Sequence, residues 1–311
     1  MDLLSVITTF STRFLGIFIE AVSFLLLGTL ISGLLESFVT HDDIVRLMPK
    51  RTLPAVLIGS FLGFIFPVCE CGVVPVTRKL YKKGLPVSVG ITFLLAAPVM
   101  NPIVLASTYA AFGFGPILIG RFVISWVMAV GIGLLFSAQP HAQRVINPSA
   151  FAMMSGGSEE AVLQAPAIPV PRMTLLPGLR HALSAASGEF FEMGRYLIIG
   201  SLLAALMQTV VSRDALKGLA SNPVNSVLVM AGLAFILSLC STVDAFIARS
   251  LLQTFTVGSV LTFLTFGPMV DIKTTSMYLG TFRRRTVVYL VVLPFLMSVL
   301  FGVWLNLNVR F

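Results

Sequence analysis

Long apolar stretches alternate with short polar connections along the chain. Window hydropathy predicts eight hydrophobic segments, most of them near the ~20 residues that cross a hydrocarbon core of roughly 30 Å. The expected spans cover residues 14–38, 54–69, 86–112, 116–137, 190–211, 224–243, 254–272 and 286–307. The pattern therefore predicts an all-α integral membrane protein with about eight transmembrane helices.

Composition agrees with a membrane protein. Hydrophobic residues make up 57% of the 311 residues and charged residues only 11%, which is too little polar surface for a water-soluble globule. Lys and Arg side chains that flank membrane spans account for the net charge of +8, because they contact anionic headgroups. We expect a multi-pass protein of the cell inner (cytoplasmic) membrane, in contact with the lipid bilayer and with no nucleic acid.

A polar segment separates the first four spans from the last four. Residues 138–188 contain Ser, Gly and Glu together with Pro140, Pro148, Pro166, Pro169, Pro171 and Pro177, a composition typical of a flexible linker. We expect three parts, namely a first membrane repeat at 1–137, a polar loop at 138–188 in the cytoplasm, and a second membrane repeat at 189–311. Loop charges do not fix the orientation, because a simple eight-span count places two basic groups on opposite sides of the membrane. One group is Arg78, Lys79, Lys82 and Lys83, and the other is Lys273, Arg283, Arg284 and Arg285.

The two halves resemble each other in three blocks that occur in the same order. The aligned pairs are Glu20 with Glu192, Gly28 with Gly200, Cys69 with Cys240, Arg78 with Arg249, Pro98 with Pro268 and Asn101 with Asp271. Many transporters are internally duplicated and bind substrate between the halves, on interrupted helices. Four full spans per half predict parallel repeats, whereas one re-entrant span per half predicts inverted repeats.

The segment from Phe66 to Pro75 places two thiols and a carboxylate between two prolines at the end of a span. Proline interrupts helical hydrogen bonding, and the freed backbone is tolerated at membrane depth only beside protein or a water-filled cavity. Thiolates are soft ligands for Cu(I), Zn(II) and similar ions. We therefore expect Cys69, Glu70 and Cys71 to bind substrate, with Cys240 completing a three-sulfur metal site. Plain apolar packing of the cysteines is the alternative.

Two further proline-containing segments interrupt apolar runs, Ala96–Pro102 and Phe266–Asp271. Broken helices of this kind direct helix-end dipoles and unpaired carbonyls at a substrate. The substrate-binding candidates in them are Pro98, Met100, Asn101, Pro102, Pro268 and Asp271. A proline kink with a polar cap at the interface is the alternative interpretation.

Carboxylates within apolar segments are costly to bury and are therefore functional candidates. Asp244 is a candidate for substrate binding, or alternatively for pairing with Arg249 on the same helix. Glu20 and Glu192 are candidates for coupling to a proton or cation. Because each lies only a turn or two inside its span, a structural position near the interface is the alternative for both.

Three sequence segments together resemble one known family. Phe66–Pro75, Leu80–Pro86 and Phe93–Ile103 are similar to motifs of the bacterial predicted-permease family that includes the trivalent organoarsenical efflux permeases, and the likeness extends over nearly the whole chain. The resemblance implies export across the cytoplasmic membrane, with the motif positions occupied by Cys69, Cys71, Pro98, Asn101 and Pro102. Branches of the family are associated with organoarsenicals or with copper and zinc. Glu70 stands where we expect Ser or another small polar residue, which favours a cation.

These features predict a permease rather than an enzyme, working without a cofactor. The sequence contains no G-x-x-x-x-G-K-[ST] phosphate-binding loop, so a gradient or a partner must supply the energy. The leading hypothesis is secondary-type efflux of a thiophilic metal, metalloid or organoarsenical between the two repeats. The alternatives are a membrane thiol oxidoreductase that uses Cys69 and Cys71, or a subunit that needs a homo-oligomer or an accessory membrane protein.

Overall fold

The computed structural model describes residues 3–40, 43–44, 48–49, 51–65, 68–138, 145–147, 175–210, 222–252 and 254–308. Within these residues the regular structure is helical, apart from an isolated bridge between Ile146 and Phe282. Helices of the first half are α1 (Leu3–Phe38), α3 (Thr52–Ile65), α4 (Glu70–Lys82), α5 (Val87–Met100), α6 (Pro102–Phe112) and α7 (Pro116–Ser137). Helices of the second half are α10 (Leu175–Val210), α12 (Pro223–Leu237), α13 (Asp244–Leu251), α14 (Val257–Met269), α15 (Ile272–Thr281) and α16 (Arg284–Asn308).

The helices are apolar enough for a multi-pass membrane protein, but the described residues do not confirm the expected eight continuous spans. Among the described residues five helices have the length and composition to cross a membrane: Ser5–Phe38, Val87–Phe112, Pro116–Ser137, Pro177–Thr209 and Arg284–Asn308. Thr52–Phe64 and Pro223–Leu237 are apolar but shorter. The expected span at 254–272 is divided, since α14 ends at Met269 and α15 begins at Ile272. Hydropathy averages over such breaks and therefore does not detect them.

Two long helices begin earlier than the hydropathy pattern predicts. Helix α1 begins at Leu3 instead of residue 14, and α10 begins at Leu175 instead of residue 190. Residues 175–188, expected in the polar loop, are therefore helical. The rest of that expected loop lies outside the described residues, except for 138 and 145–147.

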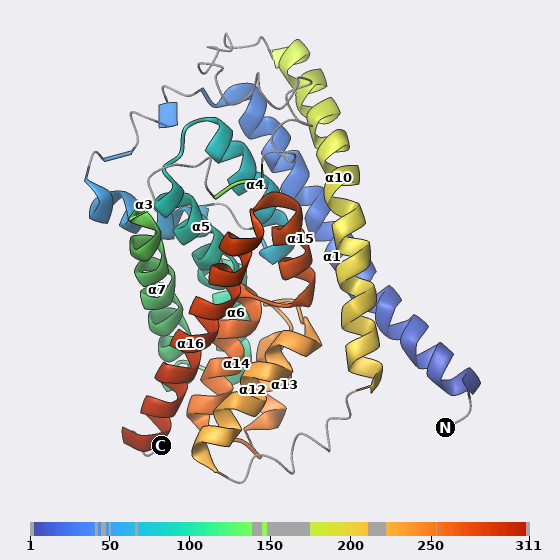
Figure 1. The fold of residues 1–311 in the computed structure, drawn as a ribbon, viewed down its shortest axis with the longest axis vertical. Helices are drawn as coiled ribbons and strands as arrows, with labels where there is room; N and C mark the ends of the chain where they lie inside the picture. The colour runs from blue at the N-terminus through green and yellow to red at the C-terminus, as the bar shows by residue number, and fades with distance from the viewer. Residues whose placement is uncertain are drawn as a thin grey trace.

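Two pairs of helices, α1 with α10 and α7 with α16, run in opposite directions (Figure 1). Helices α1 and α10 pack side by side, and Arg13 near the start of α1 donates to the Gln208 carbonyl near the end of α10. At their other ends, Ser37 Oγ lies 3.2 Å from His181 Nδ1. Helices α7 and α16 are likewise antiparallel, because Leu135 at the end of α7 lines one surface groove with Arg284 at the start of α16.

Helices α5 and α14 form the centre of the bundle. Every residue of α5 from Val87 to Met100 is buried, and nearly all of α14 is buried as well. Close packing around them requires small residues; a Cβ on Gly28 of α1 would lie 2.3 Å from the Cα of Gly72 on α4. Such approaches are typical of helix packing in membranes, where small residues let backbones come together.

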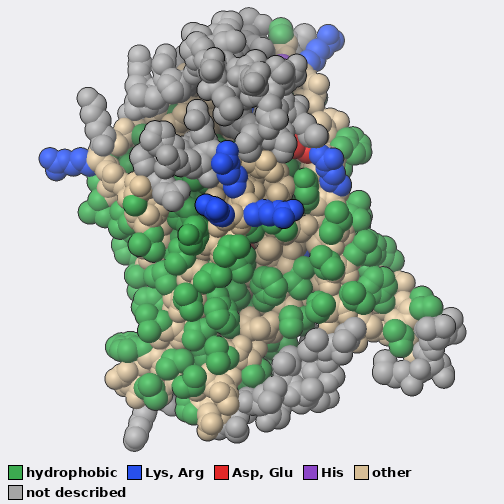
Figure 2. Space-filling view, in the orientation of Figure 1, with side chains coloured by type: hydrophobic (Ala, Val, Ile, Leu, Met, Phe, Trp, Pro, Cys, Tyr) green, Lys and Arg blue, Asp and Glu red, His purple; other side chains and the backbone are tan. Residues whose placement is uncertain are grey.

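Basic residues gather at one end of the molecule. Figure 2 shows hydrophobic side chains over the middle and lower part of one face, with Lys and Arg side chains towards the upper end. Tyr81 near the end of α4 contacts Phe282 just before α16, with ring centroids 6.3 Å apart. Lys82 and Lys83 therefore lie at the same end as Arg283, Arg284 and Arg285. The expectation that these two basic groups fall on opposite sides was wrong, because it assumed that every apolar segment crosses the membrane.

Candidate functional site

Both proline-containing segments break their helices, as expected. Helix α5 ends at Met100 and α6 begins at Pro102, with Asn101 between them accepting a hydrogen bond from the Ile103 amide at 2.9 Å. In the second half, Asp271 precedes α15 and its Oδ1 accepts from the Thr274 amide at 2.6 Å. Both polar side chains therefore serve as helix N-caps, which is the role of Asn and Asp before a first turn. Pro98 and Pro268 lie inside α5 and α14, in the last turn before each break.

A buried cluster of charged residues forms where α4 and α15 begin. Glu70 is the first residue of α4 and Asp271 caps α15, and these two helices pack against each other. The Nζ of Lys273 lies 3.8 Å from Glu70 Oε1 and 3.6 Å from Asp271 Oδ2. All three side chains are 2–3% exposed. We call Glu70, Asp271 and Lys273 the charged cluster.

The cysteines adjoin this cluster. Cys69 immediately precedes α4 and Cys71 follows in its first turn, one on each side of Glu70 in the sequence. Cys240 lies in the break between α12 and α13, where it accepts a hydrogen bond from Thr242 Oγ1 at 3.4 Å. It is within electrostatic range of Glu70 and Lys273. The three thiols are free and buried, and they lie at helix ends or breaks of both halves.

These thiols do not form a preassembled metal site. In the described part of the chain, no group of three or more His, Cys, Asp or Glu side chains is arranged to hold a metal ion. Lys273 lies between the two carboxylates that adjoin the sulfurs. Convergence of Cys69, Cys71 and Cys240 on one bound solute therefore stays a prediction, and it requires side chains to move.

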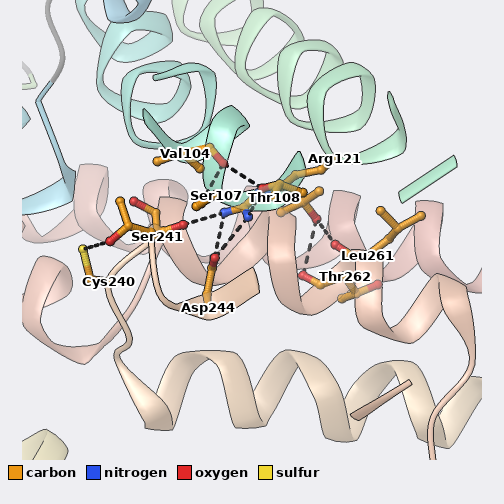
Figure 3. Close-up of polar contacts among 11 residues, drawn as sticks. Val104, Ser107, Thr108, Arg121, Cys240, Ser241, Asp244, Leu261 and Thr262 are labelled. Carbon is orange, nitrogen blue, oxygen red and sulfur yellow. Dashed lines mark hydrogen bonds and ion pairs between the residues drawn. The ribbon is translucent and has the colours of Figure 1, made fainter. Parts of the chain in front are cut away.

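Asp244 does not pair with Arg249, one of the two roles expected for it. Its two oxygens accept from Arg121 at 3.0 and 2.7 Å, and Arg121 also donates to Thr108 Oγ1 at 2.8 Å and to the Ser241 carbonyl at 3.2 Å (Figure 3). Arg121 is 0% exposed. The pair joins α7 of the first half to α13 of the second. Because both oxygens of Asp244 accept from Arg121, the geometry favours a structural role for Asp244.

The two coupling candidates have different surroundings. Glu192 on α10 forms an ion pair with Arg78 on α4, with 2.9 Å between Oε1 and Nη2. Glu20 is half-buried on α1 and lies within electrostatic range of Glu70 and Cys240. Arg249, the aligned counterpart of Arg78, instead donates to the Ala111 carbonyl at the end of α6.

Sequence reasoning missed several buried charges. The sequence pattern predicts loop positions for Arg78 and Lys273 and gives no role to Arg121 or Glu189, yet all four are at most 4% exposed. Glu189 Oε2 accepts from Ser32 Oγ at 2.6 Å. One signal was available, since Arg121 lies in the first third of the apolar segment 116–137, where an unpaired charge is costly.

Comparison with known proteins shows the family. A model described as predicted permease matches residues 6–307. The chain belongs to this family. The permease is 43% identical over 279 residues to the UPF0718 protein YcgR of Bacillus subtilis, which covers 89% of this chain and 90% of that protein. It is 40% identical over 286 residues to a protein of Streptococcus mutans named as a putative two-component membrane permease complex subunit, covering 89% of this chain and 88% of that one.

A more distant relative matches only part of the chain, and the solved structures give no match. The UPF0718 protein MJ0584 of Methanocaldococcus jannaschii is 26% identical to the permease over 120 residues, which is 37% of this chain and 32% of that protein. No solved structure matches the permease. The expected resemblance to the predicted-permease family is thereby confirmed, while the relatives' names do not identify a solute.

Proposed function

We propose that this permease exports a small thiophilic solute, a metal ion, a metalloid or an organoarsenical, across the inner membrane. The observation that carries the proposal is that Cys69, Cys71 and Cys240 are all buried, and that each lies at the end or break of a helix, in both halves of the chain. Soft sulfur ligands prefer such solutes, and helix breaks near the middle of a bundle are where transporters bind substrate. The path runs between the halves, lined by the sulfurs and by Met100, Asn101 and Pro102 at the break between α5 and α6.

The halves act as inverted copies in this proposal. The opposite directions of α1 and α10, and of α7 and α16, support inverted rather than parallel repeats. The charged cluster and the cysteines are buried, so the solute site is closed in this state. Release on either side requires the halves to move relative to each other, as in alternating access.

Loss of two cysteines tests the proposal in cells. Cells that produce the wild-type chain are expected to accumulate less methylarsenite, copper or zinc than cells without it, because sulfur capture precedes export. The variant Cys69→Ser/Cys71→Ser should return accumulation to the level of cells without the protein. Val73→Ala is a matched control, since Val73 is buried in the same helix and carries no ligand atom. Equal accumulation of all three solutes in wild-type and double-variant cells would contradict the proposal.

The orientation follows from the basic end of the molecule. Lys82, Lys83, Arg283, Arg284 and Arg285 lie together there, and Lys and Arg are enriched in cytoplasmic connections. We therefore place that end in the cytoplasm, with the segment between α7 and α10. Helix α16 runs away from it, so alkaline phosphatase fused after Phe311 should be active and green fluorescent protein at the same position dark. The reverse result would overturn the assigned orientation.

A need for a partner is a second candidate, favoured by one finding. The relative in Streptococcus mutans is named as a complex subunit, which is a statement about that protein. For this chain it motivates one comparison, in which solute export is measured with the chain alone and with the products of neighbouring genes. Export that appears only in the second case would assign the chain a subunit role. The oxidoreductase alternative has no comparable support, because the chain belongs to a permease family.

A further inference from the structure

Lys273 is a buried lysine that has no role in the capture of a solute by sulfur. It is 2% exposed in the second residue of α15. A Cβ on Gly200 of α10 would lie 2.8 Å from the Lys273 Cα, so α10 packs directly on this backbone. Burying an ammonium at membrane depth is costly unless it is paired. The position therefore needs an explanation in terms of the groups around it.

The ammonium of Lys273 is attracted by two carboxylates but is not tightly bound to either. Its distances of 3.8 Å to Glu70 and 3.6 Å to Asp271 exceed those of an ordinary hydrogen bond. Glu70 Oε2 and Asp271 Oδ2 are buried without a hydrogen-bond partner. Two carboxylates thus face one ammonium, and two of their oxygens are left without a hydrogen bond. A cation that approached these oxygens more closely would satisfy them better.

Sulfur atoms adjoin the same place. Cys69 and Cys71 flank Glu70 at the start of α4, and they and Cys240 are buried. Carboxylate oxygens combined with thiol sulfurs form a donor set for a soft or borderline divalent cation, not for a neutral arsenical alone. A cation at the position of the lysine ammonium would be held by the two carboxylates, and the thiols would complete its donor set after their side chains move.

We propose that Lys273 is an internal substitute for the transported cation. In the closed, empty state its ammonium balances Glu70 and Asp271, and a soft cation takes its place when it binds to those carboxylates and the neighbouring sulfurs. The inference rests on the proposed function and narrows its solute to a cation. It also explains the release step, because the returning ammonium competes with the cation for the same oxygens.

Equilibrium binding of Cd²⁺ to the purified full chain in detergent tests the proposal, with calorimetry as the readout. Lys273→Met should bind Cd²⁺ at least about tenfold more tightly than wild type, because the competing charge is gone. Lys273→Arg keeps the charge and should show no such gain. Lys82→Met removes a half-buried lysine at the far end of α4 and should leave the affinity unchanged. The proposal is overturned if Lys273→Met folds and binds Cd²⁺ no more tightly than wild type. It is also overturned if neither wild type nor Lys273→Met binds Cd²⁺.

A double variant covers the case in which Lys273→Met fails to fold. Lys273→Met/Glu70→Gln has the same excess of one negative charge as wild type and should recover much of the melting temperature lost in the single variant. Recovery supports the pairing of Lys273 with the carboxylates, and no recovery overturns it. In the double variant the gain in Cd²⁺ affinity should also disappear.

The outcomes separate this inference from the proposed function. Binding of Cd²⁺ is measured without transport, whereas the proposed function is tested by accumulation in cells that produce the cysteine variants. If methylarsenite accumulation depends on the cysteines while Lys273→Met binds Cd²⁺ no more tightly than wild type, the chain is an exporter but Lys273 does not stand in for a cation. If Lys273→Met binds Cd²⁺ more tightly but the wild-type chain exports no solute, the role of Lys273 stands and the proposed export fails.

Discussion

Replacing Asp244 with alanine is expected to lower the free energy of unfolding by about 3–5 kcal/mol, because it leaves a buried guanidinium without its counter-charge. Arg121 is 0% exposed, and Asp244 accepts from both of its terminal nitrogens at 3.0 and 2.7 Å. The remaining partners of Arg121, Thr108 and the Ser241 carbonyl, are neutral. Denaturant titration of the purified chain in detergent measures the change.

A double variant distinguishes the charge from the packing. Asp244→Leu/Arg121→Met replaces the pair with apolar side chains, and such replacements are often close to neutral in stability. Most of the loss in Asp244→Ala should therefore be recovered. An Asp244→Ala variant as stable as wild type would show that the pair does not hold α7 and α13 together.

The ion pair between Arg78 and Glu192 is expected to have a counterpart in the state that opens to the other side. Arg78 aligns with Arg249 and Glu192 aligns with Glu20, so inverted halves exchange one pair for the other. In the present state, Arg249 donates to the Ala111 carbonyl and Glu20 is half-buried. We therefore expect the two pairs to form in turn if the halves move as inverted copies.

Charge reversal at the two pairs should have different effects. Arg78→Glu places a second carboxylate beside Glu192 in a buried site and should lower both stability and export. Arg249→Glu should abolish export with a smaller loss of stability, because Arg249 is exposed and in this state gives up only its hydrogen bond to the Ala111 carbonyl. The double reversal Glu20→Arg/Arg249→Glu should restore export. Failure of that restoration, with both variants folded, would contradict the exchange.

The helical membrane architecture could be predicted from the sequence, but its exact helices could not. The apolar runs and the prolines predicted both breaks, at Asn101 and at Asp271, because proline and a capping side chain act locally. Hydropathy by itself gave one continuous span at 254–272, because it averages over the break that Pro268 indicated. Helix α10 begins before residue 190, because the Ser and Ala residues of 182–187 form helix without being strongly apolar.

The sulfur-containing motif could also be predicted, whereas the charges around it could not. Aligning the halves matched Cys240 with Cys69, and the structure brings it to the same region of the bundle. Lys273 and Arg78 were assigned to loops because a charged residue beside an apolar run is usually solvated. Glu70 and Glu192, which pair with Lys273 and Arg78, lie on other helices, whereas Asp271 lies only two residues before Lys273. Pairing between helices that are far apart in the sequence leaves no local pattern.

Release of a thiophilic solute from vesicles tests the central claim that the path passes the buried sulfurs. The purified chain is reconstituted in lipid vesicles loaded with methylarsenite, Cu(I) or Zn²⁺, and the rate of efflux is compared with that of protein-free vesicles. The account predicts faster efflux of at least one solute with wild type, and efflux at the protein-free rate with Cys69→Ser/Cys71→Ser. Equal efflux from vesicles with folded wild type and with the folded double variant would contradict it.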